Sequence, residues 1–260
     1  MTATTLTLVG QSVFAKEEAF KEEAAEHFVI YYQPGAARSE VSSVKNLAEK
    51  YYRTITQEFH LIREELWIWD KRAKIYIAND RDNYKQNFNC QAWSDACVDY
   101  EHKIIYTYPG QVGFSNILIH ELTHIIFREH VGRNVLPLWL DEGIATYMED
   151  KYGSGYYRRY VQKVFKGKLS RNEYITLSEL STMVPVGLDR KSKDYIDLFY
   201  GECFSLVYFI ITQYGSQNFS GFITYLQNGL TVKEALAKAY FDFRDFGNLE
   251  KKWERFYKTN

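Results

Sequence analysis

The first 110 residues alternate between strand-like and helix-like patterns of apolar positions. Aromatic and β-branched residues at 27–32 run up to Pro34 and Gly35, which predicts a strand closed by a turn. In residues 39–65 the apolar positions recur every three or four residues, which predicts a helix with Ser39 as its N-cap. The same reasoning predicts three further elements: strands at 74–78 and 104–108, and a short helix at 82–88.

Helical periodicity dominates the chain after Gly113. The predicted helices cover residues 114–129, 139–151, 156–166, 199–214, 218–227, 232–240 and 248–258. A strand-rich first half followed by a helical second half favours an α+β fold over a doubly wound parallel sheet. We therefore expect a tail at residues 1–26 and a single domain at 27–260, with a strand-containing lobe at about 27–130 and a helical lobe at about 131–260.

Composition and charge exclude some classes of partner. The chain has 260 residues, of which 46% are hydrophobic and 17% aromatic, which is enough to fill a packed core. Its formal net charge is -1 and its acidic and basic residues are interspersed, so it offers no basic face to a nucleic acid or to a membrane surface. The longest apolar stretch, residues 203–211, is about half as long as a membrane-spanning helix. We expect neither a nucleic-acid partner nor a transmembrane segment.

The N-terminal residues and the cysteines bear on the cellular location. Residues 6–15 resemble a weak apolar signal region with a small-residue cleavage site, although no Lys or Arg precedes them; a plain tail or a first helix is the alternative. Cys90 and Cys97 are candidates for a disulfide that leaves Cys203 alone, and the alternative is three small buried thiols. The export-like segment favours an extracytoplasmic location over a cytoplasmic one.

An H-E-x-x-H segment, made by His120, Glu121 and His124, lies inside the apolar run 114–127. On a helix, positions i and i+4 lie one above the other, so both imidazoles can reach a single metal ion, while Glu121 points to the neighbouring edge of that face. Catalytic zinc usually has three protein ligands and an open position for water. The segment therefore predicts a zinc hydrolase site that needs a third ligand from elsewhere in the chain.

Glu142 and His130 compete for the place of the third ligand. Glu142 lies near the predicted start of a helix, from which its carboxylate can point back at the ion. His130 has the spacing of the longer H-E-x-x-H-x-x-G-x-x-H motif, but Phe127 replaces the glycine that lets the backbone turn there. On a continuing helix His130 lies about 240° around from His124, where it suits the helix C-terminus as a cation. This favours Glu142, with Asp141 as a further alternative.

The residues around Glu142 carry a family resemblance. The segment W-L-D-E-G-I-A at 139–145, following the H-E-x-x-H segment, is similar to the gluzincin metallopeptidases of the peptidase MA-like type, whose core the aminopeptidase N family shares. The resemblance implies a zincin-like fold, a Zn²⁺ cofactor, and Glu142 as the third ligand beside His120 and His124. Seventeen residues separate His124 from Glu142, one fewer than is common in that family, and a surface loop can absorb this difference.

Further expectations follow from the same resemblance. Residues 200–210 resemble the helix whose first tyrosine steadies the tetrahedral intermediate in that family, which makes Tyr200 the candidate oxyanion donor and Tyr195 the alternative. Residues 103–108 lie where the family has its substrate-binding edge strand, which can pair with an extended peptide. The chain has no segment resembling the G-x-M-E-N of aminopeptidases, which favours endopeptidase action.

The predicted function is that of a zinc-dependent peptidase whose substrate is a peptide or protein. Glu121 is expected to act as the general base toward a metal-activated water, and Tyr200 to support the oxyanion. Thr146 and Asn116, one helical turn from Glu142 and His120, are candidates to hold the metal ligands in place. The alternative function is a catalytically silent zincin-fold protein that serves as a binding or scaffold module.

Overall fold

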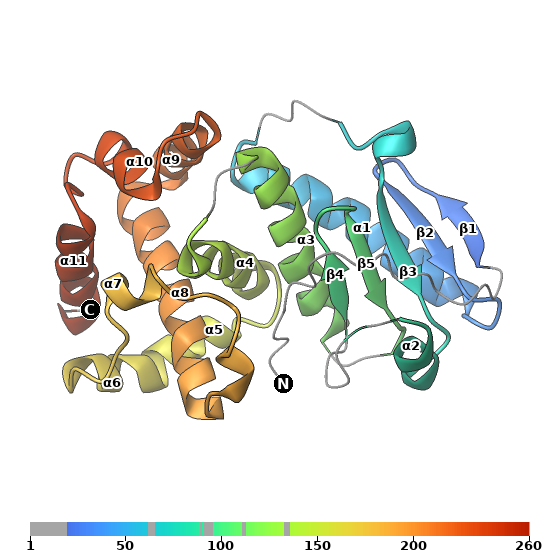
Figure 1. Ribbon diagram of the computed structural model, residues 1–260, viewed down its shortest axis with the longest axis horizontal. Helices are drawn as coiled ribbons and strands as arrows, with labels where there is room; N and C mark the ends of the chain where they lie inside the picture. The colour runs from blue at the N-terminus through green and yellow to red at the C-terminus, as the bar shows by residue number, and fades with distance from the viewer. Residues whose placement is uncertain are drawn as a thin grey trace. The chain divides into compact units, whose positions relative to one another are not determined.

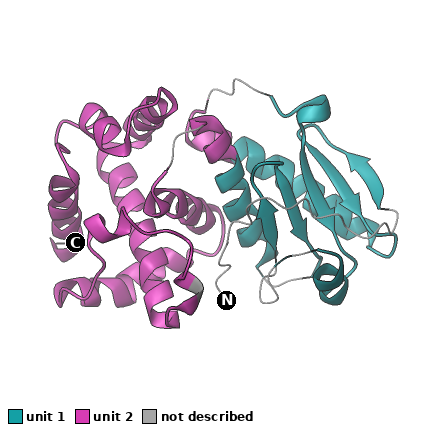
Figure 2. Ribbon diagram, viewed as in Figure 1, with its two compact units in different colours: residues 1–54, 63–125 teal, residues 55–62, 126–260 magenta. Residues whose placement is uncertain are grey.

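The computed structural model describes residues 20–61, 66–88, 90, 96–110, 113–132 and 136–259, apart from the side chain of residue 189. The chain divides into two compact units (Figure 2): unit 1 comprises Met1–Thr54 and Arg63–Ile125, and unit 2 comprises Ile55–Ile62 and Ile126–Asn260. The possible export signal at residues 1–15 lies outside the described residues.

Unit 1 contains a five-stranded sheet in the order β1-β2-β3-β5-β4 (Figure 1). The central strands β2, β3 and β5 are parallel, whereas β1 and β4 run antiparallel at the two edges. The elements in chain order are β1 (Lys21–Ala24), β2 (Phe28–Tyr32), α1 (Arg38–Glu58), the 3-10 turn η1 (Trp69–Lys71), β3 (Ala73–Ile77), α2 (Arg81–Asn87), β4 (Cys97–Asp99), β5 (Ile104–Thr107) and α3 (Phe114–Val131). The last residues of α1 and α3 are counted in unit 2.

The two faces of the central strands carry different kinds of side chain, buried on one face and buried or half-buried on the other. Aliphatic residues that pair in register share one face: Ile30, Ile75 and Ile105, each at most 2% exposed. Tyrosines share the other face: Tyr31, Tyr76 and Tyr106, whose neighbouring ring centroids are 4.7 and 5.5 Å apart. Strands that are apolar on both faces suit a parallel sheet covered on both sides. This explains why the sequence pattern revealed these three strands clearly.

Both edge strands escaped the sequence analysis. Strand β1 lies inside residues 1–26, which were expected to form only a tail, and its sequence KEEA has no apolar alternation. Strand β4 has only three residues, too few to show a period. Because β4 pairs with β5, the prediction that residues 103–108 form the edge strand is wrong, and β4 occupies that edge instead.

A disulfide joins Cys90 to Cys97, and Cys203 is free and buried. Both bonded cysteines pack against a cluster of buried aromatic residues that includes Tyr84 and Phe88. Because β4 begins at Cys97, the bond ties the start of the edge strand to the segment that follows α2.

Unit 2 is built from helices (Figure 1). They are α4 (Leu138–Tyr152), α5 (Tyr156–Tyr160), the π-helical turn η2 (Val161–Phe165), α6 (Lys166–Ser170), α7 (Leu177–Leu180), the 3-10 turn η3 (Leu188–Arg190), α8 (Lys193–Tyr214), α9 (Ser216–Gln227), α10 (Val232–Ala239) and α11 (Phe246–Thr259). Helices α4 and α8 approach closely at Gly143, where an added Cβ would lie 2.5 Å from the carbonyl oxygen of Cys203. On the other side of α8, the Trp253 indole N–H of α11 donates to the Ser205 hydroxyl at 2.9 Å. Helix α8 is therefore the core helix of the unit.

Helix α8 is also relevant to the prediction that the chain has no membrane-spanning segment. Within the described part of the chain it is the one helix long and apolar enough to cross a bilayer, and 72% of its apolar window is buried inside the protein. The core helix of a folded domain meets the same criterion of length and composition. The absence of a transmembrane segment stays a prediction.

The structure confirms the α+β class and shifts several element boundaries. Ser39 is not an N-cap, because α1 already begins at Arg38 and the backbone N–H of Val41 donates to the carbonyl of Ala37. The helix predicted from residue 199 begins six residues earlier, after Ser192, whose hydroxyl accepts from the backbone N–H of Tyr195. Its first turn has no buried residue, since Lys193 and Asp194 are exposed and Tyr195 and Ile196 are half-buried, so the apolar period did not reveal it.

Candidate metal centre

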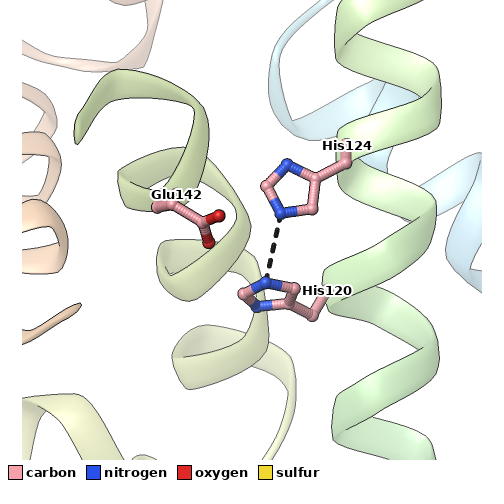
Figure 3. Close-up of side chains that lie close together, drawn as sticks. All are labelled: His120, His124 and Glu142. Atoms are coloured by element: carbon pink, nitrogen blue, oxygen red, sulfur yellow. Dashed lines mark hydrogen bonds between the residues drawn. The ribbon is translucent and has the colours of Figure 1, made fainter. Parts of the chain in front are cut away.

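Helix α3 places the two imidazoles of the H-E-x-x-H segment one turn apart. The flanking residues Ile119, Leu122 and Ile125 are at most 1% exposed, so this helix is buried and carries its histidines into the interior. His120 and His124 are 3% and 1% exposed, and their Nε2 atoms face each other at 3.1 Å (Figure 3). Two ring nitrogens directed at one point are the local geometry that a shared metal ion requires.

Glu121 lies on the same helix and is 1% exposed. The hydroxyl of Tyr100 donates to Glu121 Oε2 over 3.5 Å, and the Tyr100 ring packs edge-on against His124 with centroids 5.8 Å apart. Tyr100 comes directly after β4 and was missed in the sequence analysis. No local signal marks it among 22 tyrosines, because the pairing of β4 with β5 decides where it lies.

Glu142 is the acidic residue that the structure brings to the two imidazoles. It lies in the second turn of α4 and is 4% exposed. One ligand atom from each of His120, His124 and Glu142 lies within 4.8 Å of the others (Figure 3). Two imidazole nitrogens and a carboxylate oxygen are a donor set that zinc accepts. This group could therefore hold a metal ion.

The rival ligands lie elsewhere. Helix α3 continues without a break to Val131, so His130 stays on a different part of the helix and, within the described residues, belongs to no group that could hold a metal. Asp141 accepts from the Arg128 guanidinium, with Nε 2.9 Å from Oδ2. Its side chain is 4% exposed, so the buried carboxylate is committed to a salt bridge.

Comparison with models of known protein families assigns the chain to one of them. Residues 69–259 match the family model described as the Peptidase MA superfamily. The chain belongs to this superfamily. The match spans both the H-E-x-x-H segment and the Glu142 segment, so the sequence resemblance to gluzincins is confirmed, and the superfamily supports a metallopeptidase-like role.

The peptidase MA-like chain also resembles a solved structure. Native yeast LTA4 hydrolase matches with a TM-score of 0.55 and 16% sequence identity, over 90% of this chain and 38% of that protein. At this identity the likeness shows the fold, which is zincin-like, and the chain spans well under half of the hydrolase. No curated protein matches the sequence.

The two tyrosines predicted as oxyanion donors differ in their surroundings. Tyr200 lies on α8 and is 2% exposed. Burial raises the pKa of the Tyr157 phenol, in the same unit, well above its ordinary value, and the negative charges of Glu149 and Glu142 add to the rise. Tyr195 instead is half-buried, with its hydroxyl 4.0 Å from the Met183 sulfur.

The predicted supporting role of Thr146 is not seen. Its hydroxyl donates to backbone carbonyls of its own helix, to Glu142 O at 2.7 Å and Gly143 O at 3.1 Å. Threonine in a helix often satisfies its hydroxyl in this way. The predicted role of Asn116 stays a prediction.

Proposed function

We propose that this member of the Peptidase MA superfamily is a zinc-dependent peptidase in which His120, His124 and Glu142 hold the ion. The observation that carries the proposal is the facing pair of Nε2 atoms, 3.1 Å apart. Two nitrogens bound to one tetrahedral zinc at 2.0–2.1 Å would lie about 3.3 Å apart. The imidazole spacing therefore fits zinc with only a small adjustment.

Bound zinc would supply Lewis acidity, polarising the scissile carbonyl and lowering the pKa of water. Glu121 would take the proton of the attacking water and deliver it to the leaving amine. Its burial beside the imidazoles supports this role, because a general base acts best where bulk water does not compete.

The Tyr200 phenol would donate a hydrogen bond to the oxyanion that develops at the carbonyl. A donor of this type is worth about 3 kcal/mol of transition-state stabilisation. Its support is the family resemblance together with the burial of Tyr200 on α8, where its phenol is shielded from bulk water. Tyr195 is the weaker candidate, because its hydroxyl faces a methionine sulfur.

The substrate would be a peptide or protein in extended conformation. Among the described residues β4 is an edge strand of the sheet, and an edge strand can pair with an extended peptide. The disulfide between Cys90 and Cys97 supports an extracytoplasmic location, since disulfides persist in oxidising compartments. Neither a nucleic-acid partner nor a membrane span is part of the proposal.

The test compares metal content and peptide hydrolysis in matched variants. We expect about one zinc per chain in the wild type by mass spectrometry, and strongly reduced zinc in Glu142→Ala. Glu149→Ala, on the same helix, is the control and should keep its zinc. Glu121→Gln should keep zinc but lose turnover of a fluorogenic peptide library by about 10²–10⁴-fold.

Each outcome decides between the candidate functions. Cleavage that a chelator abolishes supports the peptidase. Stoichiometric zinc without any cleavage favours the silent scaffold, and zinc that survives Glu142→Ala refutes the ligand set.

A further inference from the structure

We propose that Tyr100 is a positioning residue that holds the Glu121 carboxylate in the orientation in which it receives a proton. The inference rests on the proposed function, because it assigns a partner to the proposed general base. Its basis is the contact of the Tyr100 hydroxyl with Glu121 Oε2 at 3.5 Å.

The hairpin that carries Tyr100 is fixed by several independent interactions. The Asp99 carboxylate accepts from the backbone N–H of His102 at 3.0 Å, and its other oxygen lies 2.8 Å from Nδ1 of the same residue. Lys103 adopts a left-handed backbone conformation with φ of 55°, which closes the turn into β5. Each of these interactions restricts the backbone on the C-terminal side of Tyr100.

The strand before Tyr100 is held as well. The disulfide fastens Cys97, and register pairs Cys97 with Tyr106 and Asp99 with Ile104 of β5. A backbone that is already held in this way loses little further entropy when the side chain it carries orients a neighbour, so the cost that remains is that of the Tyr100 rotamer. The hairpin thus restrains the backbone on both sides of Tyr100.

The ring and the hydroxyl of Tyr100 contact different residues of the candidate site. The ring meets His124 edge-on, at an interplanar angle of 79°, and therefore packs beside a predicted metal ligand. The hydroxyl donates to one carboxylate oxygen of Glu121, Oε2, and so restrains the orientation of the whole carboxylate. A hydrogen bond of 3.5 Å is long, but catalytic contacts commonly tighten when substrate binds.

Tyr100→Phe tests the role, because it removes the hydroxyl and keeps the ring against His124. We expect kcat to fall about 10-fold, with KM and zinc content unchanged, since an aligned general base contributes about 10²–10⁴-fold in full. Tyr106→Phe, on β5 of the same hairpin, is the control and should leave kcat unchanged. A wild-type kcat in Tyr100→Phe, or a change confined to KM, overturns the inference.

A double-mutant cycle on thermal unfolding tests the contact without any need for activity. If the hydroxyl binds Glu121, Tyr100→Phe lowers Tm in the wild type but has a smaller effect in a Glu121→Ala background. Additive Tm shifts would refute the contact even if the protein is a peptidase. Coupled shifts in a protein that cleaves no peptide would instead leave the contact standing and refute the proposed function.

Discussion

Gly143→Ala probes the closest approach in unit 2. At this position α4 runs against α8, and a Cβ would lie 2.5 Å from the carbonyl oxygen of Cys203 and 2.6 Å from a methyl carbon of Val207. The valine methyl can move by a change of rotamer. The carbonyl oxygen belongs to the backbone of a buried helix, so the two helices must separate by about 1 Å to restore an ordinary contact.

The net cost follows from two opposing effects. Overpacking of a well-packed core costs typically 1–3 kcal/mol, and a backbone clash belongs at the upper end of about 3 kcal/mol. Alanine is favoured over glycine inside a helix by about 1 kcal/mol, and this gain in helix propensity offsets part of the cost of the clash. We expect Gly143→Ala to lower the free energy of unfolding by about 2 kcal/mol, which for a chain of this size lowers Tm by roughly 5 °C.

The assay is thermal and urea unfolding of the metal-free protein beside a matched control. Gly221 lies inside helix α9, and a Cβ there meets nothing within 4 Å. Gly221→Ala should therefore show only the helix-propensity gain and raise the free energy of unfolding by about 0.5–1 kcal/mol. If Gly143→Ala is as stable as Gly221→Ala, the close packing of α4 on α8 is refuted.

Two further predictions concern pH and the disulfide. Burial alone would raise the pKa of Glu58, but hydrogen bonds from Lys151 at 2.6 Å and Tyr152 at 2.6 Å, with the lysine charge, hold it below its ordinary value of 4.5. A carboxyl whose pKa is lower in the folded state than in the unfolded state stabilises the protein at any pH above the unfolded-state pKa, and that stabilisation is lost as the pH falls through the folded-state pKa. Glu58→Gln should therefore make the fall in Tm below about pH 4.5 less steep than in the wild type. An unchanged slope of Tm against pH would contradict this prediction. Replacing Cys90 and Cys97 by alanine should lower the free energy of unfolding by about 2 kcal/mol in urea titrations, and equal stability of oxidised and reduced protein would contradict a folded-state disulfide.

Most helices and the three central strands could be predicted from the sequence, because each follows a period set by near neighbours. The strand at residues 27–32 and the helix at 114–129 are examples in which the predicted and observed positions nearly coincide. The short edge strands β1 and β4 have no such period. They form because the unpaired edges of β2 and β5 offer backbone hydrogen bonds, and this is a property of the assembled sheet.

In the candidate site, too, local geometry could be predicted from the sequence, whereas contacts between distant segments could not. The sequence by itself determined that His120 and His124 share a helix face, since four residues of helix span about one turn whatever surrounds them. It also carried the family segment that pointed to Glu142. Only the tertiary structure decided that Glu142 comes within reach of the imidazoles while Asp141 turns to Arg128, and that Tyr100 contacts Glu121. These contacts depend on how segments far apart in the sequence pack against each other. That packing is driven by the burial of apolar surface, which has no preferred direction, so the local sequence pattern does not predict which segments meet.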